Sequence, residues 1–424
     1  MSYRAWHVVL SGFILCNNLP LLAETLEWPA WRGAQSGGST MTGAIPVRFG
    51  PDKSLWNQAL PGRGCSTPIL SGGKIFVTCP IDGRDGLLCF DMQGRKQWQT
   101  VFGDEVAGKH RNGSGSNASP VTDGQSIFVY YKSGTLAAVD RDGTIRWQTN
   151  LVERFGPVTL FWDHGTSPVL TRDHVVMARM HKGESWLAAF SKQTGKLDWK
   201  VARNYETPVE CDHGYTTPLV IGSQRQSLLV WGAQHLTLHD ARDGRVTWSC
   251  GGFNPEAQKL WPAIASPVII GDMVIVAYGR NDRGNPRLHG VRLGGTGDVT
   301  KTAHVWKRDD IGTFVPSPIA WKEQVVLVGD QGKVAGLDPQ NGRTIWQGAF
   351  PRNRAKFYAS PIIAGDRLVA PREDGVVFVA GVADGKFELL GENDMKESVI
   401  GSPVPVRDRL VLRGERHLFC FGKP

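Results

Sequence analysis

A segment of 42 to 52 residues repeats eight times along this chain. Each copy opens with Ser or Thr followed by Pro, and these prolines stand at positions 68, 120, 168, 218, 267, 318, 361 and 403. Short apolar strands and glycine-containing turns follow, as in residues 317–346. Four short strands at this period are typical of a propeller blade, whose sheet buries its faces only against neighbouring blades. The sequence therefore predicts an all-β fold, an eight-bladed β-propeller of four-stranded antiparallel blades.

Tryptophans recur near the ends of the repeats. Five of them follow a turn glycine by four residues, in the pairs Gly94 and Trp98, Gly143 and Trp147, Gly195 and Trp199, Gly244 and Trp248, and Gly342 and Trp346. Trp306 follows an insertion, residues 294–303, and Leu389 stands where the seventh tryptophan is expected. Because an indole ring buries a large area against the next blade, we interpret these tryptophans as structural. We expect Phe387 and Leu390 to fill the space beside Leu389, so that a tryptophan there would overpack the blade.

The two ends of the repeat region complement each other. The eighth repeat ends at Phe421 without a tryptophan strand, and residues 54–60 form an unpaired strand-like segment before the first repeat. We therefore predict that this N-terminal segment is the outer strand of the last blade, with Trp56 in place of the missing tryptophan, so that the ring has no open edge. Residues 54–424 would form one propeller domain. Residues 24–53 would form an irregular arm, with Trp28 and Trp31 covering the outside of a nearby blade.

Residues 1–23 have the order of an export signal. Arg4 precedes an apolar core at residues 8–15, and small residues before Glu24 provide a cleavage site. A bulky leucine before Cys16 fits lipid-anchor processing poorly, so a soluble exported protein is favoured. No other stretch approaches the length of a membrane helix. We expect a periplasmic or extracellular protein, peripheral to the outer membrane if it is associated with it.

Two segments with the same pattern, residues 138–147 (AVDRDGTIRW) and 336–346 (GLDPQNGRTIW), resemble the pyrroloquinoline-quinone-type (PQQ-like) propeller repeat. The resemblance covers residues 54–422 and extends to secreted bacterial propellers of unassigned activity. Repeat number and size are also similar to the BamB-type propeller of the outer-membrane assembly machinery. These resemblances imply a monomeric binding or assembly scaffold whose partner is an envelope or extracellular protein, a peptide or a glycan. Quinoprotein dehydrogenases share the repeat, so a quinone- or metal-dependent oxidoreductase is the alternative.

The connections between tryptophan and the next Ser/Thr-Pro are unequal. They span 22, 21, 19 and 19 residues into repeats two to five, but only 12, 15 and 12 into repeats six, seven and one. These connections meet at one mouth of the channel, and long loops on a rigid scaffold are where binding tends to reside. Two of them carry an Asp-His-Gly motif, so the candidate ligand-binding residues are Asp163, His164, Asp212 and His213, with positive charge added by Arg111, Arg354 and Lys356.

Two interpretations of the Asp-His-Gly motifs stay open. Two histidines and two aspartates have the chemistry to hold a divalent metal or to orient a ligand. Alternatively, each histidine bonds a neighbouring loop and each aspartate caps a turn. The two motifs alone do not distinguish a metal site from structural loops.

Signals for enzyme chemistry are few. The chain has no adjacent cysteine pair of the quinoprotein kind, no assembled calcium ligands and no hydrolase motif, so no catalytic residue is assigned, and PQQ and calcium enter only under the oxidoreductase alternative. The net charge of +8 is spread over 424 residues without a Lys/Arg run, which argues against nucleic-acid binding. Cys79 and Cys89 flank the turn at residues 82–86, and a register centred on Arg84 would place them opposite each other. A disulfide there and two ordinary buried thiols are equally compatible with the sequence.

Overall fold

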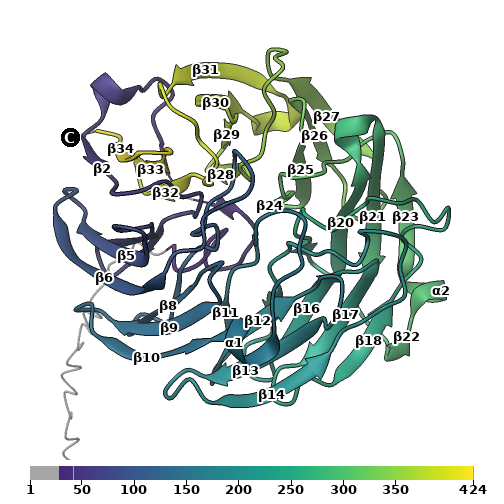
Figure 1. The fold of residues 1–424 in the computed structure, drawn as a ribbon. Helices are drawn as coiled ribbons and strands as arrows, with labels where there is room; N and C mark the ends of the chain where they lie inside the picture. Colours follow the sequence, from purple (N-terminus) through teal and green to yellow (C-terminus); the bar gives the residue numbers. More distant parts are fainter. Residues whose placement is uncertain (1–27, 42, 424) are drawn as a thin grey trace, which may run out of the picture.

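The computed structural model describes residues 28–41 and 43–423, which form a ring of eight sheets around a central channel (Figure 1). The predicted eight-bladed propeller is confirmed. The predicted export signal, residues 1–23, lies outside the described residues. Within the described ranges, no helix is long and apolar enough to cross a membrane.

The first four blades follow the chain in order from the innermost to the outermost strand. Blade 1 consists of β3 (Ile69–Ser71), β4 (Lys74–Thr78), β5 (Arg84–Asp91) and β6 (Lys96–Asp104). Blade 2 consists of β7 (Val121–Thr122), β8 (Ser126–Tyr130), β9 (Thr135–Asp140) and β10 (Ile145–Asn150), followed by helix α1 (Leu151–Phe155). Blade 3 consists of β11 (Val169–Leu170), β12 (His174–Arg179), β13 (Trp186–Ser191) and β14 (Leu197–Ala202). Blade 4 consists of β15 (Leu219–Ile221), β16 (Ser227–Gly232), β17 (His235–Asp240) and β18 (Val246–Cys250).

The other four blades complete the ring. Blade 5 consists of β19 (Val268–Ile270), β20 (Met273–Arg280), β21 (Asn285–Arg292) and β23 (His304–Arg308), with the 3-10 turn η2 (Asn281–Arg283). Blade 6 consists of β24 (Ile319–Trp321), β25 (Gln324–Val328), β26 (Lys333–Leu337) and β27 (Thr344–Ala349). Blade 7 consists of β28 (Ile362–Ala364), β29 (Arg367–Pro371), β30 (Val376–Gly381) and β31 (Glu388–Asp394), with η3 (Ala383–Gly385). Blade 8 consists of β32 (Val404–Val406), β33 (Arg409–Arg413), β34 (His417–Phe421) and β2 (Trp56–Ala59), and η1 (Pro51–Lys53) precedes β2.

The ring closes as the sequence predicts. Strand β2 pairs antiparallel with β34, and Trp56 lies opposite Cys420. The N-terminal segment therefore supplies the outer strand of the last blade. Two extra strands extend other blades: β22 (Gly297–Asp298), from the insertion before Trp306, pairs with β18, and β1 (Ser39–Thr40) pairs with β28. Helix α2 (Thr300–Ala303) completes the insertion.

The Ser or Thr that opens each repeat belongs to a belt of hydrogen bonds around the channel. The backbone N–H of one residue donates to the side-chain hydroxyl of the next, as from Thr67 to Ser119 at 2.9 Å and from Ser119 to Ser167 at 3.0 Å. The belt continues through Thr217, Ser266, Ser317 and Ser360, and Ser402 donates back to Thr67. Proline follows each of these residues and has no N–H to donate. The repeated dipeptide thus joins neighbouring blades around the ring.

The tryptophans and the turn glycines of the repeats contact each other between successive blades. The indole ring of one blade lies on the turn glycine of the next, in the pairs Trp56 and Gly94, Trp98 and Gly143, Trp147 and Gly195, Trp199 and Gly244, and Trp306 and Gly342. A Cβ at any of these glycines would come within 2.9 Å of the ring. Trp248 and Trp346 differ, since the first lies beside β22 and the second bonds Gln324 of its own blade.

The register places Gly391, not Leu389, at the tryptophan position of blade 7. In the other blades the tryptophan follows the β-bulge of the outer strand, as Trp147 and Trp346 do, and in blade 7 the residue after this bulge is Gly391, opposite Val379. A Cβ at Gly391 would clash with the carbonyl of Val47, so the N-terminal arm takes the space of the missing indole ring. Leu389 precedes the bulge and is 39% exposed, so the predicted overpacking at this position is wrong.

The apolar core lies between blades rather than within one sheet. One cluster joins Ile69 and Phe76 of blade 1 to Ile127 and Val139 of blade 2, and similar clusters follow around the ring. The largest joins blades 7, 8 and 1 and includes Val379, Phe419 and Leu88. Because each sheet is buried on both faces, no blade is expected to be stable alone.

The N-terminal arm crosses the channel instead of covering the outside of a blade. Trp28 pairs with Leu70 on the inner strand of blade 1, and Thr122 of blade 2 donates its N–H to the carbonyl of Pro29 at 2.9 Å. Three residues later the Arg32 guanidinium bonds the carbonyls of blades 6 and 7 (Pro318 and Pro361). Blades 2 and 6 are opposite in a ring of eight, so residues 29–32 span the opening, near the centre of Figure 1. The prediction for Trp28 and Trp31 was wrong because long-range backbone bonds, not surface coverage, hold the arm.

The predicted register of Cys79 and Cys89 was also wrong. Thr78 lies opposite Leu87, and the N–H of Cys79 donates to the carbonyl of Gly86, which centres the hairpin on Asp82 and Gly83. Cys89 faces Phe76 instead. The two thiols lie in separate core clusters, and all six cysteines in the described part of the chain are free.

Candidate functional site

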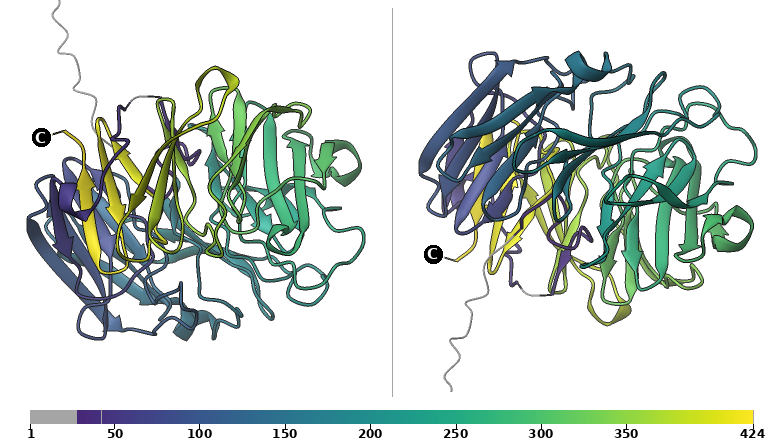
Figure 2. Two further views of the ribbon diagram at one scale, coloured as in Figure 1. Left: turned by 90° about the horizontal axis from the view of Figure 1, so that it is seen from above. Right: turned by 90° about the horizontal axis from the view of Figure 1, so that it is seen from below.

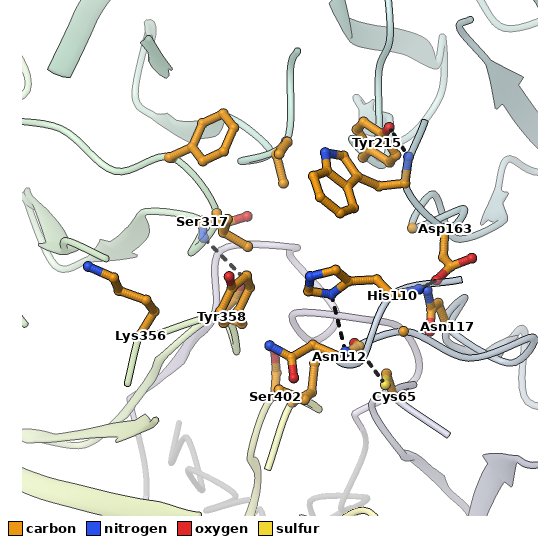
Figure 3. A pocket seen from close by; sticks show the side chains of 18 of the residues that line it. Cys65, His110, Asn112, Asn117, Asp163, Tyr215, Ser317, Lys356, Tyr358 and Ser402 are labelled. Carbon is orange, nitrogen blue, oxygen red and sulfur yellow. Dashed lines mark hydrogen bonds between the residues drawn. The ribbon is translucent and has the colours of Figure 1, made fainter. Parts of the chain in front are cut away.

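A cavity of about 310 Å³ occupies the channel at the mouth that carries the inter-blade connections. Its inner wall is the Ser/Thr belt, and its upper wall consists of side chains from several connections (Figure 3). Trp31 lines it from the arm. Because the arm crosses the channel below it, the cavity is a recess entered from the mouth. Its volume lies at the lower end of the range for small-molecule sites.

The connection from β6 to β7 extends across the mouth. The Asn112 amide donates to the Glu373 carboxylate of blade 7 at 2.6 Å, and the Arg111 guanidinium lies 3.1 Å from the same oxygen. Figure 3 shows the His110 ring between Tyr358 on one side and Asp163 on the other. The ring makes an edge contact with Trp162, 4.8 Å between centroids. His110 Nδ1 accepts the N–H of Asn112, so a neutral His110 carries its proton on Nε2.

Asp163 holds this connection in place. Its carboxylate accepts the N–H groups of Lys109 at 2.8 Å and His110 at 2.9 Å, and it pairs with the Lys132 ammonium at 2.7 Å. Burial raises the pKa of Asp163, but the bonds from His110 and Lys132 outweigh burial and leave the pKa below its ordinary value. Asp163 lines the cavity, yet its oxygens are already occupied by loop and lysine donors.

The two motif histidines lie behind the cavity wall rather than in it. His164 is 5% exposed and packs on Tyr130, with ring centroids 4.7 Å apart. Burial lowers its pKa to about 3, so its ring is neutral at ordinary pH. His213 is equally buried, burial lowers its pKa, and its Nε2 lies 3.9 Å from the Asp212 carboxylate. Neither histidine is among the residues that line the cavity.

The three basic candidates have different positions. Lys356 lines the cavity, on the far side of Tyr358 from His110 in Figure 3. Arg111 lies at the mouth and pairs with Glu373. Arg354 is exposed and is not among the lining residues. Of the seven predicted residues, the fold thus brings Asp163 and Lys356 to the cavity and Arg111 to its edge, and their roles in binding remain predictions.

Several lining residues were not singled out from the sequence. His110, Tyr358, Arg280 and Asp330 come from four different connections or turns and share no motif. Trp162 stands within the first Asp-His-Gly segment, directly before the residues that were considered. The usable signal was the length of the connections, since His110 and Trp162 both lie in the longest ones.

A set of exposed apolar side chains surrounds part of the mouth. Val106, Phe161, Trp162, Val209 and Leu260 are 38 to 61% exposed, and we call them the apolar rim. They belong to the four long connections that lead into blades 2 to 5, which are blue to green in Figure 2. The N–H of Leu260 donates to the carbonyl of Val209, so two of these connections are joined. Exposed apolar groups gathered on neighbouring loops are candidates for an interaction surface.

A family model described as outer membrane protein assembly factor BamB matches residues 51–249 and 183–421. The chain belongs to this family. The resemblance to BamB-type propellers is thereby confirmed. A BamB of Yersinia pestis is 23% identical over 386 residues, covering 87% of this chain and 88% of that protein. A BamB of Burkholderia pseudomallei is 22% identical, covering 77% and 76%.

Solved structures show the same fold in BamB and in enzymes. The BamB of Moraxella catarrhalis superposes with a TM-score of 0.61 at 14% identity, covering 87% of this chain and 99% of that one. The quinohemoprotein alcohol dehydrogenase of Comamonas testosteroni gives 0.66 at 11% identity, covering 94% and 81%. At such identities the likeness concerns the fold alone.

The carboxylates of this BamB-family cavity are committed to protein donors. Asp282 forms a two-point ion pair with Arg280, at 2.8 and 2.7 Å. Asp330 accepts the Asn281 amide and the N–H groups of Phe314 and Val315. Together with Asp163, these are the acidic residues that line the cavity. Calcium needs several converging free oxygens, so these residues do not fit the calcium and quinone site of the alternative.

Proposed function

We propose that this protein is an exported binding scaffold of the cell envelope that holds a polypeptide partner at the channel mouth. The observation that carries the proposal is the apolar rim, five exposed apolar side chains on four consecutive connections of a rigid ring. Tryptophan is among the residues that contribute most of the binding free energy at protein interfaces, so Trp162 is the expected anchor of this rim. Membership of the BamB family supports a partner in outer-membrane protein assembly.

The surroundings of the rim support protein binding as well. Asp163 and Lys132 fix the connection that carries Val106, and the Leu260–Val209 bond joins two other connections. A surface that is already ordered loses little conformational entropy when a partner binds. The export signal predicted at residues 1–23 would bring this surface to the compartment where such a partner is found.

Site-specific cross-linking tests the proposal. A photoreactive residue placed at Val209 or Phe161 in the exporting cell should form a covalent adduct with a protein of outer-membrane assembly. Ile345 provides a matched control, because it is apolar and 40% exposed but lies on an outer strand, away from the mouth. Val209→Asp should reduce the adduct formed at Phe161 at least tenfold while leaving unfolding unchanged. Equal adducts at Val209 and Ile345 would contradict the proposal.

A further inference from the structure

The Ser/Thr belt presents unused hydrogen-bond donors to the cavity. Five of its lining members, Thr67, Ser119, Ser167, Ser317 and Ser360, are 2 to 6% exposed, and each hydroxyl oxygen accepts one backbone N–H. A hydroxyl also has one proton to donate and a second lone pair. In the described part of the chain these hydroxyl protons have no protein acceptor. The belt therefore offers a circle of paired donors and acceptors to a ligand.

Aromatic rings line the same cavity as this circle of hydroxyls. Trp31 lines the cavity from the arm, and Trp162, Tyr358 and His110 line it near the mouth. Trp162 is 40% exposed, and its ring contacts the edge of His110, which contacts Tyr358 in turn. Rings of this kind combine apolar faces with polar edges. A ligand bound here would place a flat apolar face on an aromatic ring and its polar edge on the belt.

The charges around the cavity favour a neutral ligand. Asp163 pairs with Lys132, Asp282 pairs with Arg280, and Asp330 is bonded by an amide and two backbone N–H groups. Lys356 has no ion-pair partner within the described residues and adds one ammonium group with three N–H donors. One ammonium group beside three compensated carboxylates gives no strong field for an anion.

We propose that this cavity binds a neutral saccharide. A pyranose ring has a face of C–H bonds, which fits against Trp162, and a perimeter of hydroxyls, which both donate and accept and so match the Ser/Thr belt. The apolar rim is not needed for this inference, which goes beyond the proposed function. It gives the scaffold a second ligand, of glycan chemistry, beneath the surface proposed for a polypeptide.

Calorimetric titration of the mature chain tests the inference, with N-acetylglucosamine, maltose and cellobiose as probes. We expect at least one of them to bind with a Kd below about 1 mM. Trp162→Ala should weaken that binding at least tenfold. Phe161→Ala is the matched control, because Phe161 is the adjacent exposed aromatic and does not line the cavity. It should leave sugar binding unchanged while it weakens the polypeptide cross-link.

Three results would overturn the saccharide site. One is that none of the three sugars binds in this range. A second is that Trp162→Ala and Phe161→Ala weaken sugar binding equally, which would place the sugar on the rim. The third is that inorganic phosphate or citrate binds where the sugars do not, which would make Lys356 the centre of an anion site. Loss of the cross-link with intact sugar binding would refute only the proposed function.

Discussion

The contact between Trp56 and Gly94 joins the last blade to the first and can be tested by substitution. Gly94 has φ of +78°, and a Cβ there would lie 2.5 Å from Cδ2 of Trp56. The Trp56 indole N–H donates to the carbonyl of Met92 at 3.0 Å, which fixes the ring on this turn. Gly94→Ala should therefore force the indole away from the turn and weaken the closure of the ring.

The expected loss of folding free energy in Gly94→Ala has two contributions, one from the backbone and one from the clash with the indole ring. Alanine in the left-handed region costs about 1 to 2 kcal/mol of folding free energy, and forcing a methyl group into a filled space costs about 1 to 3 kcal/mol more. Gly94→Ala should thus lower the free energy of unfolding by about 2 to 5 kcal/mol. Gly73→Ala is the matched control in the same blade, because Gly73 has φ of +71° and no atom within 4 Å of the added Cβ. Gly73→Ala should therefore lose only the free energy that alanine costs in the left-handed region.

Urea unfolding of a double-mutant cycle separates the two parts. In a Trp56→Ala background the added methyl group meets no ring, so Gly94→Ala should cost only about 1 to 2 kcal/mol, and the coupling energy should be about 1 to 3 kcal/mol. Gly73→Ala should cost the same in both backgrounds. If Gly94→Ala costs no more than Gly73→Ala, or if its cost persists without the indole ring, the reasoning about tryptophan and glycine is refuted.

Two further predictions concern Leu389 and His164. Leu389→Trp should change the free energy of unfolding by no more than about 0.5 kcal/mol, because Leu389 is exposed on the outer strand and Gly391 holds the tryptophan position; a larger loss in urea unfolding would show that the site is filled. Because burial lowers the pKa of His164 to about 3, the folded state favours its neutral form, and stability is lost as pH falls from about 6.5 toward 3. Between pH 6.5 and 4.5 this loss is about 2 to 3 kcal/mol. In His164→Gln the free energy of unfolding, measured with urea, should therefore fall less steeply over this pH range. An equally steep fall in the variant would contradict the conclusion that His164 is buried in its neutral form.

The sequence alone determined the propeller because its signals are local and repeated eight times. Ser/Thr-Pro marks each inner strand, the glycine-to-tryptophan interval marks five of the outer ones, and the missing strand of the last repeat matched the unpaired segment at Trp56. Each of these signals depends on neighbours within one blade or the next. Repetition makes a weak local pattern recognisable, because a chance match to the pattern would have to recur in every repeat.

Only the tertiary structure decided how the channel is closed and what lines it. Arg32 bonds carbonyl groups more than 280 positions away, and Asn112 bonds Glu373 from the opposite end of the chain. These contacts do not recur from one repeat to the next, so the repeat pattern cannot predict them. Nor could the sequence tell that Asp163 would bind its own loops while His164 turned into the core, since adjacent residues in extended chain point in opposite directions. The repeated motifs determine the ring of blades, whereas the residues that line its channel depend on single contacts between distant blades.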